Sequence, residues 1–164
     1  MQVLLRKALE SDLRLILSWR NNPEVYRGFY TQGYLKKGLL TWGEHLSWWH
    51  SRLSWKIWMV QVSDSRNLRD VGVVSMAQLD CWRPQIGIYI GEVTLWGQGI
   101  GRKALTLALD WLKMWQYYQV WTTILKDNTR AVAMFESAGF YRVGEGREGE
   151  WEYRKKLSAN PSGN

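Results

Sequence analysis

Three glycines on alternate positions stand directly before the most regular helical pattern of the chain. They are Gly97, Gly99 and Gly101, in the stretch LWGQGIGRKA. Glycine loses more backbone entropy on folding than any other residue, and it caps a helix less well than Ser, Thr, Asp or Asn. Helix stability therefore does not explain these glycines. They indicate either a sharp turn of the backbone or a ligand that lies close to it.

A strand, a helix and a second strand surround these glycines. Residues 85–90 read as a strand, and the apolar residues from Ile100 to Trp115 recur at helical spacing. The segment from Val120 to Leu125 is rich in β-branched residues and predicts a buried strand. Such a unit forms a right-handed crossover, and we expect the functional site beside it.

Helix and strand signals also precede this unit. Ser11 can cap a helix that follows a strand over residues 2–8 and ends at Asn21-Asn22-Pro23, because proline disfavours helix in the preceding residue. Thr41 and Glu44 have the spacing of a capping box, which predicts a second helix to about Leu53. A polar, aromatic connection joins the two helices. Two further strands are expected, at residues 56–62 and 71–79.

The order of elements predicts an α+β fold, a mixed, mostly antiparallel sheet with flanking helices. After the central unit, Asp127 or Asn128 can cap a short helix that Gly139 ends, and residues 141–157 predict a closing pair of strands. The length of 164 residues fits one ordinary domain. We expect a single domain over residues 1–158 and a frayed tail over residues 159–164.

The composition narrows the class of partner. The formal net charge of +7 favours anionic partners, but the basic residues form no run, so we expect no nucleic-acid partner. No apolar run approaches the roughly 18 residues of a membrane span, and MQVLLRKALESDL lacks the apolar region of a signal peptide. Cys81 is the single cysteine, which fits a reducing compartment. We expect a cytoplasmic protein with no membrane partner and no metal.

The glycine stretch has the properties of an anion-binding site. The first N–H groups of a helix have no intrahelical acceptor, and the helix dipole favours negative charge beside them. No Ser, Thr, Asp or Asn occupies the capping position here, so a phosphate can take its place. A P-loop is excluded because Arg102-Lys103-Ala104 follow the last glycine, and a dinucleotide fingerprint fits only loosely. A tight turn that needs positive φ remains the alternative.

The glycine stretch and a second segment together resemble a known superfamily. LWGQGIGRKAL followed by LKDNTRAVAMFESAGF is similar to the acetyl-CoA-binding core of the GNAT N-acetyltransferases. The pattern of that core is Q/R-x-x-G-x-G/A and then N-x-x-A-x-x-x-Y-E-x-x-G-F. The resemblance implies a GNAT-like acyl-CoA N-acyltransferase fold, with a β-bulge or splay in the sheet. It also implies acetyl-CoA (coenzyme A) as cofactor and transfer of an acetyl group to a primary amine.

The resemblance further implies which residues hold the cofactor. The backbone amides from Gln98 to Arg102 would hold the pyrophosphate, and the edge of the strand from Ile88 to Val93 would pair with pantetheine. The implied cofactor-binding residues are Ile88, Ile90, Glu92, Val93, Gly97, Gln98, Gly99, Ile100, Gly101, Arg102, Asn128, Ala131 and Phe135. Trp96 stands where the pattern has Gln or Arg. In this departure the chain resembles the branch of ribosomal-protein N-terminal acetyltransferases.

The sequence determines the catalytic groups less closely than the cofactor-binding residues. Phe135 stands where many members carry the tyrosine that protonates the departing thiolate, so Tyr141, Tyr89 or water would have to serve. A backbone N–H near Ile90 or Gly91 can polarise the thioester carbonyl. Glu92 and His45 are the candidate bases. The alternatives are a solvated loop acid for Glu92 and a packed helix residue for His45.

The N-terminal part indicates the acceptor. LSWRNNPEVYRGFY and TWGEHLSWWHSRL resemble segments of GNAT enzymes that acetylate nucleotide-linked 4-amino sugars, including the pseudaminic-acid type. The resemblance makes Arg20, Asn21, Tyr30 and Tyr89 candidate substrate-binding residues, although Arg20 and Asn21 can also simply end the helix. Alternative acceptors are protein N-termini, small polyamines and antibiotics, and a catalytically silent acyl-CoA-binding module is a further alternative. The oligomeric state stays open, with a homodimer as one expectation.

Overall fold

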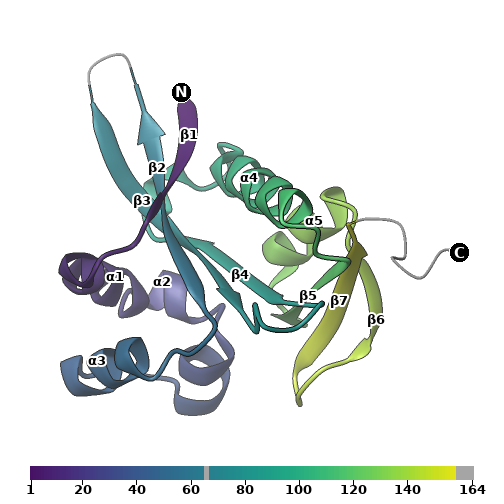
Figure 1. Ribbon diagram of the computed structural model, residues 1–164. Helices are drawn as coiled ribbons and strands as arrows, with labels where there is room; N and C mark the ends of the chain where they lie inside the picture. The colour runs from purple at the N-terminus through teal and green to yellow at the C-terminus, as the bar shows by residue number, and fades with distance from the viewer. Residues whose placement is uncertain (65–66, 158–164) are drawn as a thin grey trace, which may run out of the picture.

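The structure, a computed structural model, describes residues 1–64 and 67–157. A seven-stranded sheet with the order β1-β2-β3-β4-β5-β7-β6 forms its centre, and helices cover both faces (Figure 1). All neighbouring strands are antiparallel except β4 and β5. The predicted α+β fold with a mixed, mostly antiparallel sheet is therefore confirmed. The predicted frayed tail, residues 159–164, lies outside the described residues.

The elements follow the predicted order closely. The strands are β1 (Gln2–Lys7), β2 (Lys56–Ser63), β3 (Leu68–Ala77), β4 (Gln85–Ile90), β5 (Gln119–Leu125), β6 (Tyr141–Glu145) and β7 (Glu150–Lys156). The α-helices are α1 (Leu13–Arg20), α2 (Pro23–Tyr26), α3 (Trp42–His50), α4 (Ile100–Met114) and α5 (Thr129–Ser137). The other helical segments are the 3₁₀-helices η1 (Glu10–Asp12) and η3 (Val93–Leu95) and the π-helix η2 (Tyr30–Lys36). None of these described helices is long and apolar enough to cross a membrane.

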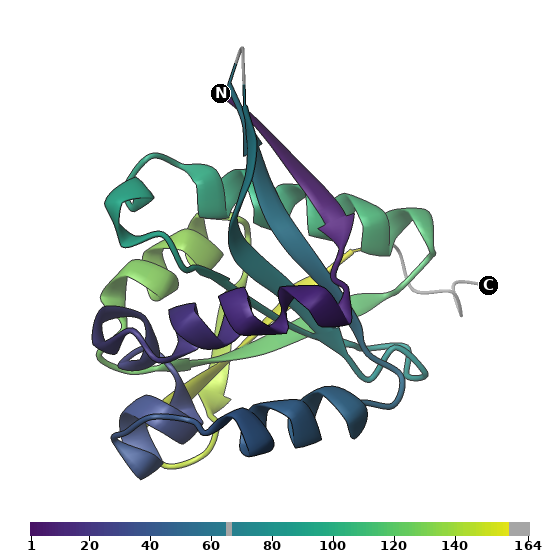
Figure 2. The same ribbon diagram turned by 90° about the vertical axis from the view of Figure 1, so that its left-hand side faces the viewer.

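Both faces of the sheet are buried, which explains the nearly continuous apolar runs of its central strands. Figure 2 shows α1 and α3 in front of the sheet and α4 behind it. On β2, Ile57 and Met59 join the core beneath α1, whereas Trp58 and Val60 join the core beneath α4. This alternation follows from the two-residue period of a strand. The two cores fix the sheet between its helical layers.

The sheet contains both irregularities that the family resemblance implied. The register of β2 against β3 shifts between Val60 and Gln61, which marks a β-bulge. The parallel strands β4 and β5 pair at a single position, Gln85 opposite Trp121, and diverge beyond it. The centre of the sheet therefore opens into a splay.

Two N-terminal predictions are wrong in detail. Ser11 caps no helix, because η1 precedes α1 and the carboxylate of Asp12 accepts the Leu9 N–H at 2.8 Å instead. The connection after α1 is also more ordered than predicted. Asn22 caps α2 by accepting the Glu24 N–H, and η2 follows, with the buried amide of Gln32 in its first turns.

Other local signals are confirmed. Thr41 and Glu44 form the predicted capping box of α3, although the helix ends at His50 and not at Leu53. Asn128 caps α5 by accepting the Ala131 N–H, and Gly139 follows the helix with φ of +89°. These helix ends depend only on residues within a few positions, so the sequence predicts them.

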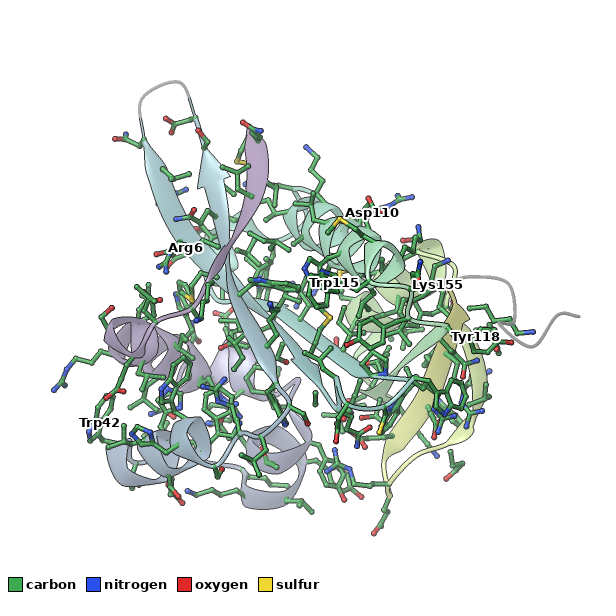
Figure 3. All side chains as sticks on the ribbon, viewed as in Figure 1. Arg6, Trp42, Asp110, Trp115, Tyr118 and Lys155 are labelled. Carbon is green, nitrogen blue, oxygen red and sulfur yellow. The ribbon has the colours of Figure 1, made fainter. Side chains whose placement is uncertain are left out.

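One guanidinium joins three elements on the outer part of the sheet. Arg6 of β1 donates to both carboxylate oxygens of Asp12 at 2.8 Å (Figure 3). The same group donates from Nε to Asp70 of β3 at 3.0 Å. All three side chains are partly buried. This network ties β1, η1 and β3 together where α1 begins.

We expect Arg6→Leu to lower the free energy of unfolding by roughly 1–3 kcal/mol, because it leaves two partly buried carboxylates without a cation. Arg6 also holds the pKa of Asp12 below its usual range. That stabilisation is present at neutral pH and is lost as the pH falls from about 4 through the lower folded-state pKa. Urea unfolding of wild type and variant across this range measures both effects. Arg69→Leu, an exposed change of equal charge on β3, is the control, and equal losses in both variants would contradict the expectation.

Candidate functional site

A cleft of about 850 Å³ opens where β4 and β5 diverge. We call the part lined by residues of β4, β5, the glycine turn and α5 the donor limb. The acceptor limb is the part lined by residues of α1, of the segment from α2 to η2, of α3 and the loop after it, and of the turn between β6 and β7. A smaller hollow of about 160 Å³ adjoins the point where the strands part. Both spaces share Trp55, Ser75, Gly87, Thr122 and Thr123. The crossover thus does lie beside the cleft, as expected.

The splay exposes backbone groups of β4. Gly91 donates its N–H to Val71 O on β3 at 2.8 Å. Alternate residues of a strand direct their backbone groups to opposite sides, so those of Tyr89 face β3 and those of Ile88 and Ile90 face the splay. Of the two predicted polarising donors, Gly91 is therefore occupied, and Ile90 is available.

The three glycines of the turn have different structural roles. Gly97 and Gly99 have φ of +80° and +75°, and a Cβ at either would meet nothing within 4 Å. Gly99 is the N-cap of α4 and provides no side-chain hydrogen bond, so the first N–H groups of the helix remain open to the cleft. A Cβ at Gly101 would lie 3.0 Å from the Met134 sulfur, so this glycine lets α4 approach α5. Both the turn and the anion-site interpretation are consistent with this geometry.

Most of the implied cofactor residues line the cleft. They are Ile88, Ile90, Gly97, Gly99, Ile100, Gly101, Arg102, Asn128, Ala131 and Phe135. Gln98 is exposed and does not line it, and its side-chain amide donates to Thr94 O at 3.4 Å. Phe135 is buried and packs edge-on against Phe140, with ring centroids 5.0 Å apart. An uncapped helix start, unpaired strand groups and an apolar wall together suit a phosphate-bearing, extended cofactor.

Glu92 and Val93 lie away from the cleft, which corrects their predicted roles. The Trp19 indole donates to the Glu92 carboxylate at 2.9 Å. A Cβ at the neighbouring Gly91 would lie 2.1 Å from the same indole, so α1 packs tightly here. Val93 begins η3, outside the cleft lining. Glu92 anchors α1 to the sheet, and its carboxylate lies outside the cleft lining.

His45 is also not placed to act as a base. It is buried between α1 and α3, does not line the cleft, and donates from Nε2 to Leu13 O at 3.1 Å. Its ring stacks on Trp48 with centroids 5.3 Å apart. Burial, followed by the charges of Arg20 and Arg52, holds the pKa of His45 below its usual value. This geometry favours the alternative of a packed helix residue.

Tyr141 does not reach the cleft either. It lies on the edge strand β6, is 45% exposed, and accepts a long hydrogen bond from Gln119 at 3.4 Å. Asn21 likewise has a structural partner, because its side chain bonds both the N–H and the carbonyl of Leu40. Neither residue contacts the space in which an acceptor would bind.

Arg20 and Tyr89 both line the cleft. The Arg20 guanidinium lies 4.7 Å from the Phe29 ring centroid and donates to Gln32 at 2.9 Å. The Tyr89 hydroxyl is buried and has no hydrogen-bond partner among the described residues. Burial raises the pKa of Tyr89, although the Arg20 charge opposes this, so the phenol keeps its proton.

Tyr30 meets a residue that the sequence did not single out. The Arg147 guanidinium lies 3.6 Å from the Tyr30 ring centroid and donates from Nε to the buried Glu150 carboxylate at 2.9 Å. A Cβ at Gly149 would lie 2.7 Å from the Tyr34 ring. The β6–β7 turn thus closes against η2. No local pattern indicates this contact, because its partners are separated by more than a hundred positions in the sequence.

We expect His45→Gln to leave kcat within about twofold of wild type and to lower stability, since the residue packs and does not react. Protonation of the buried ring opposes folding, so wild-type stability falls as the pH drops below about 6.5 towards the lower folded-state pKa. The variant should lose this dependence. Denaturant unfolding between about pH 5 and pH 8 tests it, and a large loss of kcat at unchanged stability would refute it.

Comparison with known proteins agrees with this geometry. The family model described as the acetyltransferase (GNAT) domain matches residues 2–141. An uncharacterized protein of Methanocaldococcus jannaschii is 41% identical over 156 residues, which cover 95% of this chain and 31% of that protein. The chain therefore spans about a third of the length of this curated relative.

Solved structures show the same fold. A crystallised domain from Methanocaldococcus jannaschii has a TM-score of 0.90 and 40% identity, covering 95% of this chain and 99% of that one. Spermidine N-acetyltransferase from Vibrio cholerae, in complex with CoA and spermine, has a TM-score of 0.77 and 19% identity, and the match covers 95% of this chain and 96% of that one. Aminoglycoside acetyltransferase AAC(6')-Ib, in complex with coenzyme A, has a TM-score of 0.79 and 17% identity, and the match covers 94% of this chain and 95% of that one. The last two support the fold alone.

Proposed function

The chain belongs to the acetyltransferase (GNAT) domain family, and from this premise we propose that it is an acetyl-CoA-dependent N-acetyltransferase whose acceptor is the primary amine of a nucleotide-linked amino sugar. The arginine-rich, aromatic lining of the acceptor limb carries this proposal. The N-terminal segments also resemble those of GNAT enzymes that acetylate nucleotide-linked amino sugars, and this resemblance supports the proposal independently.

The charges of the acceptor limb favour an anionic acceptor. Arg20, Arg27 and Arg147 line this limb, opposed by Glu24 and by Glu150, whose carboxylate is held by Arg147. A guanidinium can bind a phosphate through two parallel hydrogen bonds. A polycationic amine would instead meet like charges. A diphosphate linker suits this wall better than a polyamine does.

Aromatic rings complete the same limb. Phe29, Tyr30, Trp48 and Trp55 line it, and flat apolar faces of this kind bind sugar rings and nucleobases. The contact between Arg147 and Tyr30 closes one side of the limb. Closure favours a compact acceptor over a long peptide, which makes protein N-termini the second candidate.

The donor supplies an activated acetyl thioester, and the open α4 start, the splay edge of β4 and α5 fit its binding. The Ile90 N–H faces the splay and can stabilise negative charge on a carbonyl oxygen. Phe135 offers no proton. Ser75 and Thr123 line the point where the strands part, and we assign their hydroxyls the relay of the amine proton to water, because the neighbouring Thr122 side chain points to the opposite face of β5.

A panel of amines tests the acceptor class directly. We expect thiol release from acetyl-CoA with a nucleotide-linked 4-amino sugar, and a kcat/KM roughly tenfold to a hundredfold lower with the free amino sugar, because the latter lacks the phosphates that the arginines bind. Spermine and peptide N-termini should react more slowly still. Turnover with peptides alone would refute the sugar assignment, and no turnover with any amine would favour a silent binding module.

Arg20→Lys tests the role of the acceptor wall. We expect the KM for the nucleotide-linked acceptor to rise about tenfold while the KM for acetyl-CoA stays unchanged, because lysine loses the planar fork and the stacking of arginine. Arg14→Lys is the matched control, since Arg14 stacks on Trp42 with its guanidinium 4.9 Å from a ring centroid but does not line the cleft. Figure 3 shows Trp42 at the outer side of α3. Equal effects of both changes would argue against acceptor binding by Arg20.

A further inference from the structure

Trp96 has a fixed position at the mouth of the donor limb. Its indole Nε1 donates to Ile90 O at 2.8 Å, which satisfies a backbone group that faces the splay. The residue directly precedes the glycine turn and lines the cleft. The indole is therefore held between the end of β4 and the start of α4.

Arg130 stacks on the indole ring of Trp96. It is the second residue of α5, and its guanidinium lies 3.7 Å from the Trp96 ring centroid. Arg130 also lines the cleft. None of the ion pairs found among the described residues includes it. Its positive charge is thus held in the cleft without a carboxylate to neutralise it.

Stacking leaves the guanidinium ready to bind an anion. The contact with the indole uses the face of the group, whereas its N–H donors point outward in its plane. Close packing of Gly101 against Met134 brings the start of α4 beside α5, so the donors of Arg130 lie on the same limb as the open N–H groups of α4. Trp96 thereby orders a side chain that would otherwise lose considerable entropy on binding.

We propose that Arg130, held on Trp96, binds a phosphate in the nucleotide half of coenzyme A. The inference rests on the donor and not on the identity of the acceptor. It explains the departure at Trp96, where the family pattern has a polar or cationic side chain. Here the cation comes from α5 and the indole positions it. Trp96 is then a positioning residue, and Arg130 is a binding residue.

Isothermal titration without any acceptor tests the proposal. We expect Arg130→Ala to weaken coenzyme A binding about tenfold or more, and to leave the weak binding of pantetheine unchanged. Trp96→Phe, which keeps an aromatic face but loses the bond to Ile90, should weaken coenzyme A binding less. Dephospho-coenzyme A distinguishes the two phosphate sources. An equal loss for this ligand assigns Arg130 to the pyrophosphate, and a smaller loss assigns it to the 3′-phosphate.

Arg83→Ala is the matched control. Its guanidinium lies 5.5 Å from the Trp82 ring centroid, outside the cleft lining, and the change removes the same charge. The proposal is overturned if Arg130→Ala binds coenzyme A like wild type, if Arg83→Ala loses as much, or if pantetheine binding falls in parallel. Wild-type protein that binds no coenzyme A would overturn the donor assignment as well. A wrong acceptor would leave all these titrations unaffected.

Discussion

The divergence of β4 and β5 is the constraint on which the rest of the structure depends. Backbone N–H and C=O groups inside a sheet are costly to leave without partners. Here two parallel neighbours pair at a single position, and the groups of Ile88 and Ile90 face open space in the middle of the sheet. Trp96 satisfies one of them. The others suit an extended ligand that completes the sheet in place of a strand.

Keeping such a gap open requires support from both layers. On one face, α4 and α5 approach each other closely because Gly101 has no side chain. On the other face, α1 is fixed by the bond between Trp19 and Glu92, and η2 is held by the contact of Arg147 with Tyr30. The donor limb is thus built from the C-terminal half of the chain. The acceptor limb draws mainly on the N-terminal half.

The sequence predicted what local chemistry determines. The glycine turn, the Asn128 cap and the capping box of α3 depend on neighbours within a few positions, and all three are present in the structure. Glu92 and His45 were assigned the wrong roles because their partners, Trp19 and Leu13, are distant in the sequence. A carboxylate or an imidazole carries no local sign of the group that will occupy it. Arg147 was missed for the same reason.

The two departures from the family pattern act on opposite sides of the donor limb. Phe135 contributes an apolar ring to the α5 wall, and this ring is buried against Phe140. Hydroxyl groups that can take part in proton transfer lie elsewhere in the cleft, at Tyr89, whose hydroxyl lacks a partner among the described residues, and at Ser75 and Thr123, where the strands part. Trp96 replaces a polar side chain but holds the cation of Arg130 in the cleft. Arg130 belongs to the α5 segment of the motif, whereas the residues that line the acceptor limb come from other segments, which explains why the motif identifies the donor and not the acceptor.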